Sequence, residues 1–292
     1  MRLIGLRLPR IILVLAIGLA LAACSAIKLG YNTLTDVSYW WLDSYIDFNE
    51  QQAPAAKQEL ASLHAWHRRE EVPKFADLLV RMQQLAPASI SPQQACGVVT
   101  EVQSRLGFAA EHAEPAILKL AASLGPAQLR HIERKYRGNN EKFTREWIQP
   151  GPEEVREKRY EQMLDKLEMI YGSLDAPQRA VLRQGIAQSI YDPQRVLAER
   201  KRRQQDLLQT LRRMQEPGTT PDAARTALRG YLDRVQHSPD LAYRAWQDQL
   251  LQEGCRTFSA VQESTTTAQR QEAVRRLRGY ERDLRELAGQ AS

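Results

Sequence analysis

Apolar residues recur at spacings of three and four along nearly the whole chain after residue 33, as they do on one face of an α-helix. No convincing segment alternates apolar and polar residues in the manner of a half-buried strand. Glycine and proline stand mainly between the periodic segments, where one helix ends and the next begins. The pattern therefore predicts an all-α fold, a multi-helix bundle of antiparallel helical hairpins. The predicted helices cover residues 33–50, 54–71, 73–86, 92–112, 115–123, 126–148, 152–171, 177–191, 193–215, 221–236, 239–262 and 266–288.

Three of these helices begin with a similar motif, in which a residue able to cap the helix precedes a proline of the first turn. The motifs cover residues 89–94, 123–128 and 173–178. They are either a degenerate repeat of helical hairpins or convergent capping chemistry, which their unequal spacing favours. The segment 216–221, Glu-Pro-Gly-Thr-Thr-Pro, is the clearest turn in the chain. It is either a domain boundary or, as we expect, a loop between two long antiparallel helices.

The first 23 residues have the three parts of a secretory signal. Arg2, Arg7 and Arg10 form a basic start, residues 11–21 are apolar, and two small residues follow. The apolar run is shorter than the roughly 20 residues that a permanent membrane helix needs. We therefore expect residues 1–23 to be a signal peptide that is removed.

The segment Leu21-Ala22-Ala23-Cys24 resembles the bacterial lipobox, which predicts cleavage between Ala23 and Cys24 and acylation of the Cys24 thiol. Attached acyl chains would then anchor the protein in a membrane. Residue 25 is serine, and the absence of aspartate there resembles the outer-membrane default. Residues 24–292 are predicted to form one helical domain that faces the periplasm.

Composition excludes two other classes of protein. The chain is 43% hydrophobic and 26% charged, which is ordinary for a globular protein and unlike a disordered or polytopic membrane protein. Its formal net charge of +6 includes three arginines of the signal peptide, so about +3 remains on residues 24–292. So small a charge is weak evidence for a nucleic-acid partner, and none is expected.

The stretch 31–48 is rich in tyrosine and tryptophan and lies just after the predicted anchor. Such side chains favour the membrane–water interface, so this helix could rest on a bilayer. Acidic residues at positions 36, 43 and 47 argue against an anionic membrane. The alternative is a first helix that packs into the core, and both interpretations stay open.

Two groups of residues are candidates for metal or disulfide chemistry. His64, His67 and Glu71 lie near one face of a predicted helix, which a metal could use, but no second set of ligands is evident. We therefore expect neither a metal nor another cofactor. Cys96 and Cys255 are the cysteines left once Cys24 is acylated, and the periplasm is oxidising, so they are predicted to form a disulfide. The basic run 200–203 is flanked by acidic residues and is expected to be a solvated face with local ion pairs.

Several motifs, in this order along the chain, resemble a family of Gram-negative lipoproteins classed as a domain of unknown function. They are Leu29-Gly30-Tyr31-Asn32, Trp40-Trp41-Leu42-Asp43, Trp66-His67-Arg68-Arg69-Glu70-Glu71-Val72-Pro73 and Asn140-Glu141-Lys142-Phe143. The resemblance implies an all-helical envelope lipoprotein and brings no reaction, cofactor or catalytic residue. In the third motif we expect structural roles for Trp66, His67, Arg68, Glu71 and Pro73. Trp66 is predicted to be largely buried, and the polar members to join a local hydrogen-bond network.

No common enzyme motif is present, neither a Gly-rich phosphate loop nor G-x-S-x-G nor H-E-x-x-H. We therefore expect no enzyme, but a lipid-anchored scaffold or adaptor that binds an envelope protein or a cell-wall polymer. The alternatives are a cell-wall enzyme or enzyme activator, and a carrier of an apolar ligand in an interhelical groove. Converging carboxylates in a deep cleft would favour the enzyme, and a large apolar cavity would favour the carrier.

Overall fold

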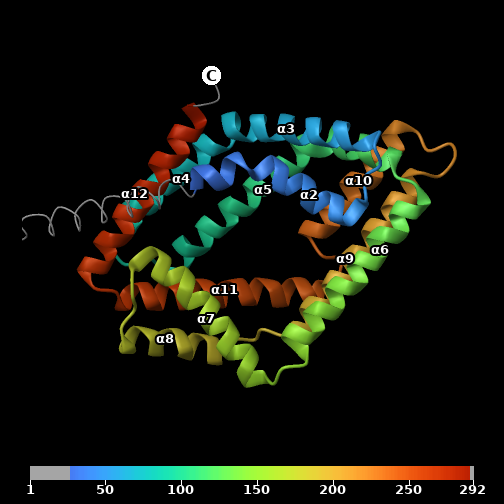
Figure 1. Cartoon of the computed structure of the whole chain (residues 1–292). Coiled ribbons are helices and arrows are strands. Elements are labelled where there is room, and N and C mark those ends of the chain that lie inside the picture. Colours follow the sequence, from blue (N-terminus) through green and yellow to red (C-terminus); the bar gives the residue numbers. More distant parts are fainter. Residues whose placement is uncertain (1–26, 290–292) are drawn as a thin grey trace, which may run out of the picture.

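A computed structural model describes residues 27–289 of the chain. The predicted signal peptide, including Ala23, and the predicted acylation site Cys24 lie outside the described residues. Within residues 27–289 all regular structure is helical, which confirms the all-α prediction (Figure 1). The helices are α2 (Leu34–Ile46), α3 (Gln52–Glu70), α4 (Val72–Leu85), α5 (Pro92–Ser123), α6 (Pro126–Phe143), the π-helical turn η1 (Thr144–Ile148), α7 (Pro152–Tyr171), α8 (Ala176–Ala187), α9 (Pro193–Met214), α10 (Pro221–Gln236), α11 (Leu241–Ser264) and α12 (Thr267–Gly289).

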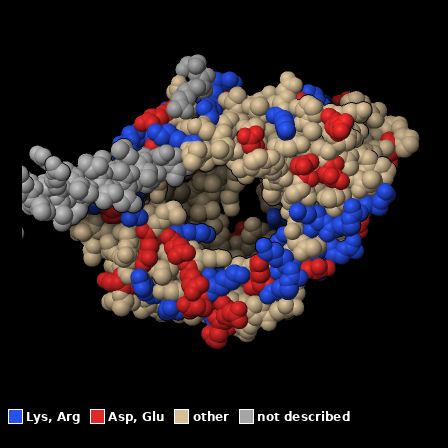
Figure 2. All heavy atoms as spheres, viewed as in Figure 1, with Lys and Arg blue, Asp and Glu red and all other residues tan. Residues whose placement is uncertain are grey.

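The helices are arranged as a ring (Figure 1). Near the start of the chain α4 packs along α12, the last described helix, and this contact closes the ring. Helix α5 runs inside it and contacts α3, α10 and α11. The space-filling view shows an opening in the middle of the same face (Figure 2). The turn at 216–221 joins the packed antiparallel helices α9 and α10, as expected. No helix of the described residues is long and apolar enough to cross a membrane.

Two hydrophobic clusters fill opposite parts of the ring. One lies among α7, α8, α11 and α12 and includes Leu167, Leu182, Val261 and Leu277. The other lies among α2, α5, α6, α9 and α10. Its fully or nearly buried members are Ile46, Ala121, Leu124, Leu129, Ile132, Leu208, Leu211, Met214 and Leu228. The periodic apolar positions of the sequence therefore meet in two places, each closed by helices that are distant in the sequence.

Each cluster is joined by a pair of glutamines that stand at helix starts. Gln52 of α3 and Gln128 of α6 exchange side-chain hydrogen bonds of 2.7 and 3.3 Å. Gln178 of α8 and Gln269 of α12 do the same at 2.8 and 3.0 Å. All four also accept the backbone N–H at the start of their own helix. The same join thus occurs twice, α2–α3 against α5–α6 and α7–α8 against α11–α12, and it includes Gln128 and Gln178 of two of the three helix-start motifs.

The predicted break between residues 112 and 115 is wrong, because α5 continues through Pro115. A proline inside a helix removes one backbone hydrogen bond and costs roughly 3 kcal/mol. Contacts on both sides of Pro115 offset that cost: before it the buried Glu114 accepts a 2.6 Å hydrogen bond from Arg229 of α10, and after it Ala121 is buried in the second cluster. Two smaller differences are that α8 ends at residue 187 and that the last turn of the helix predicted at 126–148 is η1.

Candidate functional site

Two of the motifs quoted above meet in space. The Tyr31 hydroxyl lies 2.9 Å from Nδ1 of His67, and the Tyr31 carbonyl oxygen lies 3.0 Å from Nε2 of His64. Arg68 donates to the side chain of Asn32 at 2.6 Å, and its guanidinium lies over the Tyr31 ring. The polar members thus form the predicted local network. It fastens the segment before α2 to the end of α3.

The remaining motif residues bring α3 to α4 and α5. Trp66 is half-buried and not largely buried as predicted, because its ring stacks on His112 of α5 at the surface, with centroids 3.9 Å apart. Glu71 is 2% exposed and pairs with Lys74 at 2.6 Å and, more loosely, with Arg105 at 3.8 Å. Pro73 lies in the first turn of α4, where its missing N–H costs no helical hydrogen bond. The motif therefore shapes a helix junction.

Burial shifts the titration of the groups in this network. It lowers the pKa of both His64 and His67, and it raises the pKa of Tyr31. Both rings engage Tyr31, so they do not point at a common empty position. Among residues 27–289 no group of three His, Cys, Asp or Glu side chains could hold a metal ion.

The aromatic stretch 31–48 has some residues packed in the core and others exposed, so it has features of both the core helix and the membrane-surface helix. Tyr45, Ile46 and Phe48 pack in the second cluster, as a core helix would. Other large apolar residues in this stretch and just before it remain in contact with solvent. They are Leu29, Leu34, Val37, Trp40 and Trp41, each between 42% and 66% exposed. Helix α2 therefore presents apolar side chains both to the core and to solvent.

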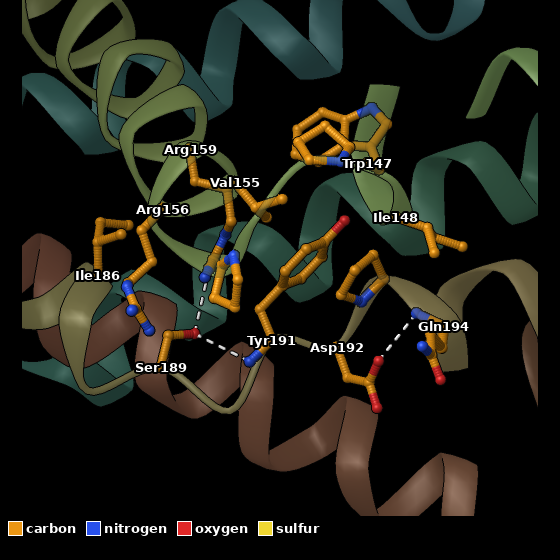
Figure 3. Close-up of a pocket in the computed structure, with 13 residues that line it drawn as sticks. Trp147, Ile148, Val155, Arg156, Arg159, Ile186, Ser189, Tyr191, Asp192 and Gln194 are labelled. Atoms are coloured by element: carbon orange, nitrogen blue, oxygen red, sulfur yellow. Dashed lines mark hydrogen bonds between the residues drawn. The ribbon is translucent and has the colours of Figure 1, made fainter. Parts of the chain in front are cut away.

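A pocket of about 320 Å³ lies where η1, α7 and the start of α9 meet (Figure 3). The guanidinium of Arg159 lies over the Tyr191 ring and donates to Ser189 at 3.1 Å. Ser189 in turn donates to the carboxylate of Glu253 on α11. Asp192 caps α9. The polar groups of this pocket already bind one another, so we assign it a structural role.

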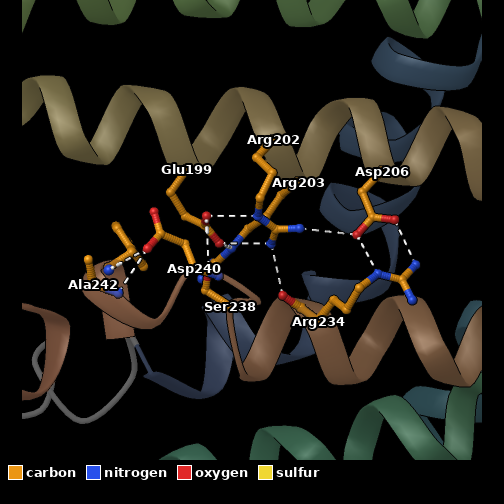
Figure 4. Close-up of polar contacts among 9 residues, drawn as sticks. Glu199, Arg202, Arg203, Asp206, Arg234, Ser238, Asp240 and Ala242 are labelled. Atoms are coloured by element: carbon orange, nitrogen blue, oxygen red, sulfur yellow. Dashed lines mark hydrogen bonds and ion pairs between the residues drawn. The ribbon is translucent and has the colours of Figure 1, made fainter. Parts of the chain in front are cut away.

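A second polar cluster fixes α9 to the α10–α11 corner (Figure 4). Glu199 is 5% exposed and accepts hydrogen bonds of 2.8 Å from both Arg202 and Arg203, and one from Ser238. Burial alone raises the pKa of Glu199, but the hydrogen bonds from the two arginines outweigh it and hold the pKa below its usual value. The expected ion pairs are present, but Glu199 is buried and not part of a solvated face.

An apolar cavity of about 530 Å³ lies between α4, α5, α7, α11 and α12. Its walls are almost wholly hydrophobic. They are formed by Met82, Leu85, Ala86, Ile90, Ala95, Val98, Val99, Met163, Ile170, Tyr171, Gln247, Leu250, Leu251, Gly254, Cys255, Phe258, Ala273 and Leu277. None of these residues is charged. The sequence could not distinguish them from ordinary core positions, since they have the same composition and the same helical spacing.

The predicted disulfide forms part of this wall. Cys96 of α5 and Cys255 of α11 are bonded, with their Cα atoms 5.6 Å apart and a sequence separation of 159. The bond holds α5 and α11 together along one side of the cavity. A covalent bond therefore fixes the distance between two of the wall helices, whereas the other wall helices are held by packing.

Comparison with known proteins gives a family and nothing beyond it. Residues 44–244 match a family of unknown function, DUF6279. No curated protein and no solved structure matches the chain. The matched segment begins inside α2 and ends in the first turn of α11, so it contains the junction built by Trp66 to Pro73 but not Cys255 or α12. It spans well over half of the chain, and the chain therefore belongs to the DUF6279 family of unknown function.

Proposed function

We propose that the protein is a non-enzymatic lipoprotein of the outer membrane, anchored through Cys24 and facing the periplasm, whose helical body carries an apolar ligand. The observation that carries the ligand part is the cavity of about 530 Å³ without a charged residue in its walls. Sites for small molecules commonly have volumes of about 300–1,000 Å³ and mostly apolar linings. The anchor and location are supported by the basic leader and by Leu21-Ala22-Ala23-Cys24.

An apolar ligand suits this cavity better than water does. The cavity is half open to solvent, and its apolar walls favour an apolar occupant because water in contact with them finds few polar partners. An empty space also costs stability, since its walls lose dispersion contacts. Met82 and Met163 are flexible and polarisable, so the walls can adapt to a chain-like occupant. The lining also includes Tyr171 and Gln247, whose side chains supply its polar groups.

Two glycines provide a matched test. Gly254 lines the cavity and Gly97 does not, yet each stands beside a disulfide cysteine in a helix and an added Cβ meets nothing within 4 Å at either site. Gly254→Leu should therefore project into the cavity, while Gly97→Leu should remain outside it. We expect the first variant to weaken binding of a fluorescent fatty acid roughly tenfold or more, about 1.4 kcal/mol, and the second to leave it unchanged. Equal binding by wild type and both variants would refute the carrier.

An adaptor is the second candidate, favoured by exposed apolar residues on α5. Leu106 is 63% exposed and Phe108 is 49% exposed, on the helix that runs inside the ring. Photo-crosslinkers placed at these two positions should capture a discrete envelope protein if the chain is an adaptor. The cell-wall enzyme finds no support at the cavity, whose walls contain neither aspartate nor glutamate.

A further inference from the structure

The exposed apolar side of the first helix is continuous. Leu34, Val37 and Trp41 stand at spacings of three and four on α2, so they form one stripe, and Trp40 flanks it. Leu29 extends the stripe, because the backbone hydrogen bonds from Thr33 to Leu29 and from Val37 to Thr33 continue the helix through the turn at residue 33. The surface over α2 is mainly uncharged in the space-filling view (Figure 2). Contiguous exposed apolar patches mark interaction sites.

The position of the stripe in the chain identifies what covers it. The first described residue, Ile27, is helical and lies three residues after Cys24. Three residues span at most about 11 Å, so an acylated Cys24 would hold the start of this helix at the membrane surface. The helix rises by about 1.5 Å per residue, so Trp41 lies only about 21 Å further along. Tryptophan favours the headgroup region, because there its apolar ring contacts lipid while its N–H group reaches water.

The stripe also has a fixed orientation relative to the rest of the protein. The contacts of Tyr31 with His67 and of Asn32 with Arg68 hold the beginning of the helix against α3. On the other side of the helix Ile46 is buried in the core, and Tyr45, whose ring contacts that of Trp41, packs against the core at the edge of the stripe. The helix cannot turn its stripe inward without breaking these contacts.

We infer that the stripe formed by Leu29, Leu34, Val37, Trp40 and Trp41 lies on the lipid bilayer that holds the anchor, and so sets how the ring stands on the membrane. The inference rests on the proposed acylation of Cys24. Attraction between opposite charges is not the cause, because Asp36 is exposed beside the stripe and would be repelled by anionic lipids. Apolar burial therefore drives the contact, which should persist at high salt and on phosphatidylcholine.

Quenching of tryptophan fluorescence by brominated lipid tests this contact. The acylated protein is reconstituted into phosphatidylcholine vesicles that carry bromine on their acyl chains. The double variant Trp40→Phe and Trp41→Phe is compared with a control, Trp147→Phe and Trp246→Phe, at positions away from the stripe. We expect strong quenching in wild type and control, and loss of most of it in the α2 variant. Circular dichroism shows whether each variant is folded.

Each outcome has one meaning. Quenching that depends on Trp40 and Trp41 and survives high salt supports the contact. Absence of quenching in folded, vesicle-bound wild type overturns it and leaves the stripe for a protein partner, as does equal quenching in the two double variants. An intact-mass measurement on the same samples reports acylation of Cys24 separately. Missing acyl chains would thus refute the anchor. The dependence of quenching on Trp40 and Trp41 is still measured on the protein that co-floats with the vesicles.

Discussion

Gln178 and Gln269 hydrogen bond to each other through their side-chain amides in both directions, although 91 residues separate them in the sequence. Gln178 also donates to the carbonyl oxygen of Ser264 at the end of α11, and Gln269 donates to that of Ser173 after α7. Each glutamine thereby caps the start of its own helix. It also binds a carbonyl oxygen in the segment that leads into its partner's helix. Gln178 is only 2% exposed, so these bonds replace water entirely.

Replacing Gln178 with alanine should destabilise the protein. The change leaves the Ser264 carbonyl and the Gln269 amide without their buried partner, and an unsatisfied buried polar group costs about 1–3 kcal/mol. Urea unfolding followed by circular dichroism measures the loss. Gln184→Ala, at an exposed position of the same helix, is the matched control and should change the free energy of unfolding little. Equal effects of the two changes would contradict a structural role of the pair.

Gly185 is expected to tolerate no side chain. A Cβ built there would lie 2.5 Å from Cγ2 and 2.6 Å from Oγ1 of Thr257, so α8 and α11 approach each other closely at this point. Gly185→Ala should lower stability by roughly 1–3 kcal/mol through overpacking. Gly97→Ala, at a site open to solvent, should be neutral or stabilise by about 0.5–1 kcal/mol because alanine favours helices.

A double-mutant cycle assigns the Gly185 effect to its cause. Thr257→Ala removes the two nearest atoms, so in combination with Gly185→Ala it should restore part of the lost stability. Strictly additive effects would mean that the two helices do not collide at Thr257.

Stability should fall as the pH drops below about 6.5. Folded His67 has a lowered pKa because it is buried, whereas the unfolded chain takes up a proton at the ordinary value of 6.5. The unfolded state then binds more protons in this range, so acid favours unfolding, and this contribution is absent well above pH 6.5. Unfolding by urea at several pH values between about 5 and 8 measures the slope. His67→Gln should reduce it, and His237→Gln, at an exposed site, serves as the control.

Acylation of Cys24 can be measured directly. Cys24→Ala should abolish incorporation of a labelled fatty acid, because only the thiol accepts the first lipid group. The variant should then either leave the membrane fraction or retain its uncleaved leader. Ser25→Asp in the same chain should preserve the label. Labelling that continues in the alanine variant would refute the lipobox prediction.

The helices could be predicted because their determinants are local. Apolar spacing and first-turn prolines such as Pro92 and Pro126 act within a few residues of the position that they control. Pro115 misled the prediction because its local cost is outweighed by Glu114 and Arg229, 115 residues apart. A single sequence contains no sign of that pairing.

The candidate sites were predictable to different degrees. The disulfide followed from the cysteine count and the predicted compartment alone, since only one pair remained once Cys24 was assigned to acylation. For the motif around His67 the network could be predicted, but its partner Tyr31 could not, because no pattern links the two helices. The cavity left no trace in the sequence. A wall residue such as Val98 and a core residue such as Leu182 look alike until their neighbours are known.

The closure of the ring by α4 and α12 bears on which part of the chain can fold as an autonomous unit. The family match ends at residue 244, before most of α11 and all of α12. A chain cut there would leave α4 without α12, the helix that it packs against most extensively. It would also leave Cys96 without Cys255, and Gln178 without Gln269. The end of the family match therefore does not coincide with the end of a packed unit. A fragment that ends at residue 244 should behave as an open, aggregation-prone intermediate, and folding of the protein has to wait for its last 45 or so residues.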